Sequence, residues 1–274
     1  HLCLTNNKKN YKMETTVNKT KRRNSLLLKG CFVLLVALVL QIPVAMVKSL
    51  VNDRKGLSDE VKNEITTSWG GAMDVTAPRL QVPFTKEVNN KKENYQRTIP
   101  SSEVIIDADV NSKIITRSIY DIPVYSADMT VTGKIELKKN SLDLCDGPIR
   151  LLLPFTRLKG IEGRPAVIVG GKEYDVKVQG NSLAVELPYD VVAAADILEY
   201  SIRIKSNGLD YIRFCPEGSI YKVNMKSNYC SPGFKGDFLP VDRTVSDKGF
   251  NARWIVTDLN SLASSSQYFD VEFI

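Results

Sequence analysis

The chain has 274 residues, 43% hydrophobic and 25% charged, which is typical of a globular chain that can bury a core and excludes a disordered or coiled-coil class. Residues 1–29 hold eight of its 37 Lys and Arg and one of its 31 Asp and Glu, so this short arm carries +7 and the rest of the chain −1. Nucleic-acid binding needs a basic patch on the folded domain, so the charge distribution argues against a nucleic-acid partner.

The first 24 residues form the basic arm. The sequence starts at His1 and reaches its first methionine at Met13, so residues 1–12 are interpreted as translated upstream sequence. We therefore base no fold prediction on them.

An uncharged run of eighteen residues, Gly30 to Val47, follows between Lys29 and Lys48. At about 1.5 Å per residue a helix of this length covers about 27 Å, close to the roughly 30 Å hydrocarbon core of a bilayer. We therefore predict a transmembrane helix over residues 25–50. A cleaved signal peptide is the alternative, but the run exceeds a usual apolar signal region, contains Pro43 and is followed by no clear small-residue cleavage site.

Basic residues cluster before this helix. Lys21, Arg22, Arg23 and Lys29 all lie on its amino-terminal side. Cytoplasmic flanks of membrane helices are enriched in Lys and Arg, so these four residues predict a cytoplasmic amino terminus. Everything after the helix is then expected on the opposite side of the membrane.

Residues 51–77 are predicted to form a juxtamembrane helix or linker. Leu57, Val61, Ile65 and Trp69 recur every four residues, which is the spacing of one stripe on a helix. Such a stripe indicates an amphipathic helix that rests on the following domain or on the membrane surface.

From residue 78 the pattern changes to short alternating runs separated by turn residues, such as RLQVPF, EVIIDADV and IYKVNM. Gly170 and Gly171 lie between VIV and KEYDVKV, as in a two-residue hairpin turn. Strands at this spacing, without long helical patterns between them, predict a mainly β fold with an antiparallel, sandwich-like domain over residues 78–274. The run QYFDVEFI stops at Ile274 in an apparent strand, so we expect this domain to be truncated at its C-terminus.

Residue types suited to catalysis or metal binding are scarce. His1 is the sole histidine, which excludes Ser/His/Asp or Cys/His catalysis and histidine-containing zinc sites in the domain. The cysteines lack CxxC spacing, and neither a P-loop nor a dinucleotide fingerprint is present. Asp237, Asp242 and Asp247 are candidate carboxylates, but aspartates in surface turns are far commoner than catalytic pairs. We expect no enzyme activity, no metal and no cofactor.

Two separated motif regions stand out in the chain. The first reads LQIPVAMVKSLVNDRK, followed by Ser68-Trp69-Gly70 and Pro78-x-Leu80-x-Val82-Pro83. The second comprises Ser227-Asn228, Ser231-Pro232, Phe234, Gly236, Phe238-Leu239-Pro240, Gly249-Phe250 and Ala252-x-Trp254. Together they resemble the CreD family of bacterial inner membrane proteins.

The resemblance implies a noncatalytic, polytopic inner membrane protein of the cell envelope, associated in bacteria with envelope stress, antibiotic response and colicin tolerance, with no established reaction. It also implies that the bulk of the chain is periplasmic. The expected partners are the lipid bilayer, the protein's own missing C-terminal membrane helices and other envelope proteins. Two alternatives remain: a single-span signalling ectodomain, for which the short arm leaves no room for a cytoplasmic effector, and a membrane-tethered hydrolase, which the lack of histidine weakens.

Cys215 and Cys230 are a candidate disulfide. They fall at either end of a predicted strand pair, in a compartment expected to be oxidising. Closing a loop of about 15 residues would stabilise the domain by roughly 3 kcal/mol. The alternative is that Cys145, Cys215 and Cys230 stay free as small buried hydrophobic residues.

The stretch SNYCSPGFKGDFLP, residues 227–240, is followed by a β-like segment and not by a helix, which disfavours a phosphate cradle. Its glycines predict tight turns, and its aromatic residues predict buried apolar surface. Two interpretations remain open. The aromatics fold into the domain's own core, or Phe234, Gly236, Phe238, Leu239 and Pro240 form a docking motif for the missing membrane helices.

Overall fold

The computed structural model describes residues 11–273 except 89–90, 118, 139, 157 and 259–266, and it describes side chains from residue 28 onward. The chain divides into two compact units, residues 1–60 and residues 61–274, which are described separately. The first twelve residues, interpreted above as upstream sequence, lie almost entirely outside this description.

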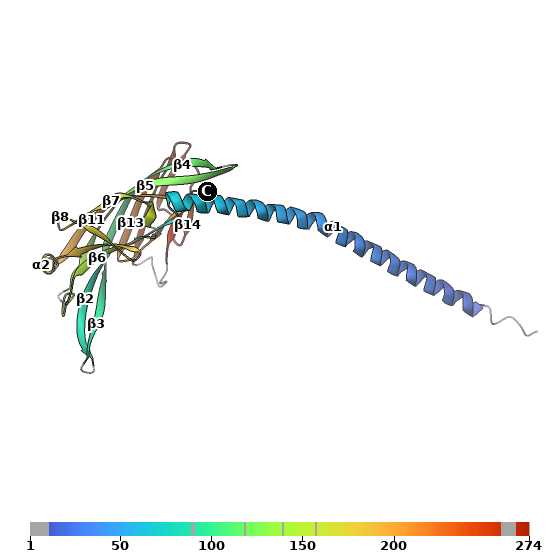
Figure 1. Cartoon of the computed structure of the whole chain (residues 1–274), viewed down its shortest axis with the longest axis horizontal. Helices are drawn as coiled ribbons and strands as arrows, with labels where there is room; N and C mark the ends of the chain where they lie inside the picture. Colours follow the sequence, from blue (N-terminus) through green and yellow to red (C-terminus); the bar gives the residue numbers. More distant parts are fainter. Residues whose placement is uncertain are drawn as a thin grey trace, which may run out of the picture. The chain divides into compact units, whose positions relative to one another are not determined.

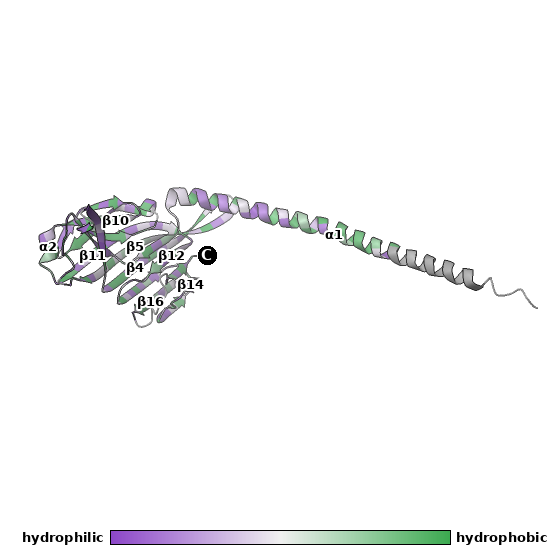
Figure 2. Ribbon diagram, turned by 90° about the horizontal axis from the view of Figure 1, so that it is seen from below, coloured by the Kyte–Doolittle hydropathy of each residue, from purple (hydrophilic) through white to green (hydrophobic). Residues whose placement is uncertain are grey.

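The first unit consists of most of helix α1, which runs over 59 residues as Tyr11–Trp69 and contains Pro43 (Figure 1). Its part from Leu28 onward includes an 18-residue window of mean hydropathy 2.6 with no buried residue, so by length and composition it is a candidate membrane span. Figure 2 shows this apolar stretch in green along the helix. The predicted span over residues 25–50 lies within α1.

The second unit is built mainly of strands. The strands are β1 (Met73–Thr76), β2 (Arg79–Val88), β3 (Lys91–Pro100), β4 (Glu103–Arg117), β5 (Tyr120–Glu136), β6 (Ile149–Pro154), β7 (Ile161–Val169), β8 (Lys172–Tyr174), β9 (Val176–Gln179), β10 (Ser182–Leu187), β11 (Ile197–Leu209), β12 (Tyr211–Cys215), β13 (Ile220–Ser227), β14 (Gly233–Gly236), β15 (Asp242–Ser246), β16 (Gly249–Thr257) and β17 (Phe269–Glu272). A 3₁₀ turn, η1 (Leu158–Gly160), and a short helix, α2 (Tyr189–Ala193), connect some of them. The prediction of a mainly β fold behind an N-terminal apolar helix is confirmed.

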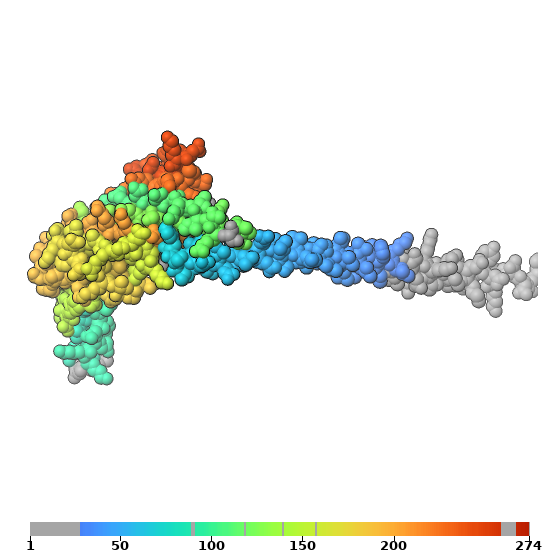
Figure 3. All heavy atoms as spheres, turned by 45° about the horizontal axis from the view of Figure 1, so that its top comes forward, coloured from blue at the N-terminus to red at the C-terminus, as the bar shows by residue number. Residues whose placement is uncertain are grey.

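The described strands form three sheets, with the orders β1-β12-β17-β14, β3-β2-β6-β10-β9 and β15-β16-β13-β4-β5-β11-β7-β8. Most neighbours are antiparallel, as predicted, but β1 pairs with β12 and β13 pairs with β4 in parallel. The β2–β3 hairpin projects from the rest of the unit, as the teal arm at the bottom of Figure 3 shows. Gly170 and Gly171 join β7 to β8 with φ angles of 56° and 80°, so the predicted two-residue hairpin turn is confirmed.

The eight-stranded sheet has two different faces. On its inner face, alternate residues such as Val104 and Ile106 are fully buried in the main hydrophobic core, which also contains Trp254 and Phe269. The outer face is mostly polar, except where the last turns of α1 lie on it. There Ile65 packs on Ile122, Val124 and Leu209 in a second, smaller cluster.

Residues 61–69 of α1 therefore rest on the β-domain, which was one of the two positions open to the predicted stripe. Val61, Ile65 and Trp69 all belong to this contact, whereas Leu57 is 52% exposed. After Trp69 the chain enters strand β1, Met73–Thr76. The first strand therefore begins five residues before residue 78, where the sequence pattern placed the start of the β-domain.

Candidate docking surface

The predicted docking motif lies on β14, on the linker that follows it and next to β15. We call Phe234, Phe238, Leu239, Val241 and Val245 the ledge. β14 is an edge strand of the four-stranded sheet, and β15 is an edge strand of the eight-stranded sheet. The ledge therefore crosses from the border of one sheet to the border of another.

The inner side of the ledge rests on aromatic side chains of the main core. The ring of Phe234 lies edge-on to Phe250 and to Trp254, with ring centroids 5.6 Å apart in both pairs. Phe238 lies edge-on to Phe269 at 6.5 Å, and Phe269 stacks on Trp254 at 5.1 Å. Such pairs are favourable beyond the apolar area they bury, so this floor holds the two phenylalanines in place.

Gly236 fixes the turn between the two phenylalanines. Its φ is +103°, and a Cβ atom at this position would meet the Tyr268 carbonyl oxygen at 2.5 Å or closer and Phe269 Cα at 2.7 Å. The Asp237 amide donates to the Tyr268 oxygen at 2.8 Å, and the Tyr268 amide donates to the Asp237 carboxylate at 3.0 Å. The glycine and these two hydrogen bonds hold the linker tightly against β17.

The outer side of the ledge is apolar and exposed. Leu239 is 65% exposed, Val241 53% and Val245 47%, while Pro240 between them is half-buried. All five residues of β15 are exposed. Val241 and Val245 were not part of the predicted motif, and Arg243 between them on the same face of β15 breaks the apolar alternation that would have indicated them.

The structure brings the predicted motif together, but its members differ in surroundings. Phe234 and Phe238 are half-buried against the main core, as the first interpretation of the motif expects. Leu239 points away from that core, as the second expects. The motif is therefore a packed aromatic floor that carries an uncovered aliphatic rim.

Cys215 and Cys230 do not form the candidate disulfide, because both are free thiols. β12 and β13 lie in different sheets, and the two cysteines flank the eight-residue β13 at its opposite ends, roughly 25 Å apart along the strand. A disulfide needs Cα atoms about 4.4–6.8 Å apart. Cys215 is half-buried, and this burial raises the pKa of its thiol, whereas Cys230 is exposed and its Sγ lies 3.1 Å from the Asp247 carbonyl oxygen.

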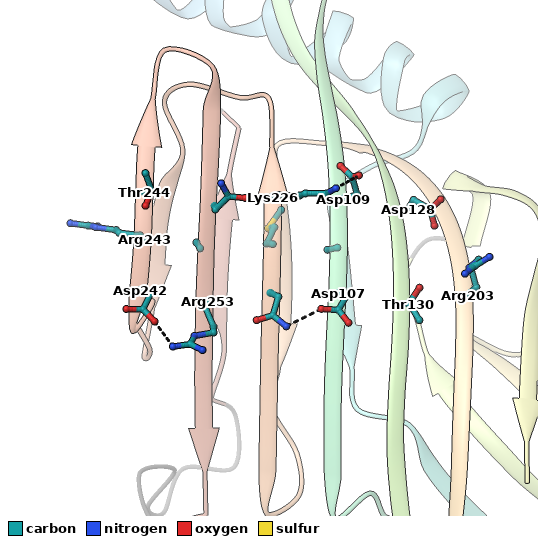
Figure 4. A pocket seen from close by; sticks show the side chains of 15 residues that line it. Asp107, Asp109, Asp128, Thr130, Arg203, Lys226, Asp242, Arg243, Thr244 and Arg253 are labelled. Carbon is teal, nitrogen blue, oxygen red and sulfur yellow. Dashed lines mark hydrogen bonds and ion pairs between the residues drawn. The ribbon is translucent and has the colours of Figure 1, made fainter.

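A hollow of about 740 Å³ lies on the outer face of the eight-stranded sheet (Figure 4). Its charged side chains pair across neighbouring strands: Arg253 contacts Asp242, and Lys226 contacts Asp109 at 2.8 Å. The Asp109 carboxylate raises the pKa of Lys226. Among the described residues, no group of three or more His, Cys, Asp or Glu side chains is placed to hold a metal ion.

The three candidate carboxylates have separate surroundings. Asp237 accepts a hydrogen bond from the Tyr268 amide, and Asp242 pairs with Arg253. Asp247 lies in the turn between β15 and β16. Of the predicted topology determinants, Lys29 is exposed on α1, and the side chains of residues 21–23 lie outside the described part of the chain.

These features define a mainly β domain that follows an N-terminal candidate membrane span. The family model described as "Inner membrane protein CreD" matches residues 25–270, so both the span and the ledge lie within the match. The chain belongs to the CreD family, which confirms the resemblance.

The chain is similar in sequence to a curated relative and was compared with a solved structure. The inner membrane protein CreD of Escherichia coli (strain K12) is 24% identical over 237 residues, which cover 79% of this chain and 52% of that protein. The chain thus spans about half the length of this curated relative. The M1 zinc metallopeptidase of Deinococcus radiodurans is 8% identical, with a TM-score of 0.33, over 63% of this chain and 42% of that one. A similarity at this TM-score carries no argument about fold or function.

Proposed function

We propose that this protein is a noncatalytic component of the cell envelope, with a role in envelope integrity or stress response. In this proposal the basic arm is cytoplasmic, α1 crosses the inner membrane once, and the β-domain lies in the periplasm. The ledge docks on membrane helices that follow in the complete protein. Other envelope proteins are further candidate partners.

The observation that carries the docking proposal is the exposed rim of Leu239, Val241 and Val245. These aliphatic side chains lie within seven residues of one another in the chain, and the neighbouring Phe234 and Phe238 are held by ring contacts with the main core. Exposed apolar patches on an ordered support are typical of interaction sites. The noncatalytic role is supported by the paired charges of the hollow on the eight-stranded sheet and by the single histidine at position 1.

Thiol labelling tests the docking proposal. Cysteine is placed at Leu239, in a background with the native cysteines changed to serine, in the 274-residue chain and in the complete gene product. Val178, also 65% exposed but on β9 of another sheet, is the matched control. We expect that only position 239 becomes at least tenfold slower to label in the complete protein. Equal labelling rates at position 239 in the two forms would contradict the proposal.

A reporter fusion tests the proposed orientation. Alkaline phosphatase folds to an active enzyme only where its disulfides form, so a fusion after Ile274 should be active. The same fusion with the cations at positions 21, 22, 23 and 29 changed to glutamine should lose part of that activity, because these cations set the orientation. An inactive phosphatase together with an active cytoplasmic reporter at the same site would overturn the periplasmic location.

A further inference from the structure

The β4–β5 hairpin, residues 103–136, extends past the main core, and one of its sides is occupied by α1. Ile122 and Val124 are buried against Ile65 there, and Val61 packs beside them. Near the end of the hairpin, Arg117 Nη1 lies 3.3 Å from Glu64 Oε1. One side of the hairpin is therefore held by the helix that leads to the candidate span.

The opposite side of the hairpin is open. Ile115 pairs with Ile122 on the α1 side, so the adjacent pair, Ile114 and Pro123, faces the other way. Ile114 is 66% exposed, and Ile119 at the end of the hairpin is 67% exposed. Two isoleucines at this exposure leave an apolar strip directly behind the contact with α1.

The described end of the chain arrives at this open side. The Phe273 ring lies against Tyr125 with centroids 4.9 Å apart, and Tyr125 is on the same side of β5 as Pro123, two residues away. The Phe273 amide donates to the Asp210 carbonyl oxygen at 2.8 Å. Figure 2 marks the C-terminus beside β12 and β14, the two strands that pair with β17.

The direction of the chain also points along the hairpin. β11 runs toward the hairpin end, since Leu209 pairs with Val124, and β12 runs back from it. β17 is antiparallel to β12, so it again runs toward the hairpin end, and Phe273 lies against Tyr125 of β5. Residues that follow would continue from Tyr125 toward Pro123 and Ile114.

We propose that the segment of the complete protein that follows residue 274 packs on Ile114, Pro123 and Ile119. The β4–β5 hairpin then lies between the two connections of the domain, with α1 on one side and the continuing chain on the other. The chain covers 52% of the length of the curated relative. The inference depends on membership of the family and on the position of Phe273, and it is independent of docking at the ledge.

Photocrosslinking tests this inference. A photoreactive residue is placed at position 114 of the complete gene product, which is expressed and crosslinked in the native cell membrane. Peptide mass spectrometry should identify an adduct with a peptide from beyond residue 274. The same residue at Val178, which has a matching exposure of 65%, should give no such adduct. An adduct with lipid, with a second copy of the chain or with another protein overturns the inference, and so does the absence of any adduct.

Thiol labelling gives a second measurement that does not depend on crosslinking chemistry. Ile114→Cys, in the background without native cysteines, should label at least tenfold more slowly in the complete protein than in the 274-residue chain. Equal rates overturn the inference, whatever is found at position 239. Conversely, protection at position 114 with free labelling at position 239 contradicts only the docking of the ledge.

Discussion

The β-domain contains two hydrophobic clusters that differ greatly in size. The main core joins residues from all three sheets, and it contains Trp254, Phe269 and Phe214 stacked on one another. The cluster that seats α1 has only four buried residues, one of them Ile65 from the helix. Free energy from apolar burial scales with the area removed from water, so the main core supplies most of the stability of the domain.

The small cluster is supplemented by polar contacts at its border. Trp69 Nε1 donates to the Tyr125 carbonyl oxygen at 3.3 Å, and the Lys113 ammonium lies 4.1 Å from the centre of the Trp69 ring. Lys62 Nζ lies 3.3 Å from the Asp210 carboxylate. These contacts hold residues 61–69 on the domain, and because the cluster is small we expect it to open at a lower free-energy cost than the main core.

The largest expected effect comes from the main core. Trp254→Ala should lower the free energy of unfolding of the 274-residue chain by about 3–5 kcal/mol, because Trp254 is 1% exposed and its removal leaves a large cavity. Thermal unfolding in detergent measures the change, with Val178→Ala as an exposed control that should leave the transition nearly unchanged. A loss below about 1 kcal/mol would contradict the assignment of the main core as the source of stability.

High pH should destabilise the same core. Burial raises the pKa of Tyr125, Tyr200 and Tyr221 above the usual value near 10. Below pH 10 these side chains are protonated in both states, but above it the unfolded chain loses protons first, so stability falls as pH rises. At pH 11 the three tyrosines together should lower the free energy of unfolding by about 4 kcal/mol.

Phenolate absorbance, followed together with circular dichroism, checks this prediction. The three buried tyrosines should ionise only as the β signal is lost. Ionisation of Tyr125, Tyr200 and Tyr221 in a domain that keeps its β signal would contradict the prediction.

A substitution in the small cluster should lower the free energy of unfolding by less, and should affect mainly the contact between α1 and the domain. Ile65→Ala should cost about 2 kcal/mol, the lower end for such a change, because few neighbours surround the side chain. Limited proteolysis should show faster cleavage near residues 70–72, where the chain leaves the helix, while the main thermal transition moves little. A shift as large as that of Trp254→Ala would show that the two clusters unfold as one.

Local patterns predicted the parts of this structure that depend on neighbours in sequence. The uncharged run predicted the candidate span, the four-residue stripe predicted an amphipathic helix, and Gly170-Gly171 predicted its hairpin turn. The residues that contact Ile65 could not be predicted from local patterns. They lie on β5 and β11, which are far apart in sequence and become neighbours only when the two strands pair in the sheet. Parallel pairing of β4 with β13 likewise depends on contacts between strands more than 100 residues apart.

The candidate disulfide shows where such local reasoning fails. Cys215 ends β12 and Cys230 follows β13, so even a β12–β13 hairpin would place one at the turn and the other past the open end, and the two strands in fact belong to different sheets. At the ledge, the aromatic and glycine residues predicted a packed turn. The exposure of Leu239 depends on which strands cover it, and the sequence alone does not contain that arrangement.

The smallest expected effect is at the ion pair beside the small cluster. Both side chains are 44% exposed, so Lys62→Met should cost no more than about 1 kcal/mol, and that cost should vanish at high salt. Asp210 has a φ of 68°, a conformation that glycine adopts more easily than alanine. Asp210→Gly should therefore be nearly neutral, while Asp210→Ala loses the pair and keeps the backbone strain. Urea unfolding of these variants measures the differences, and equal stability of the glycine and alanine variants would show that the backbone at Asp210 carries no strain.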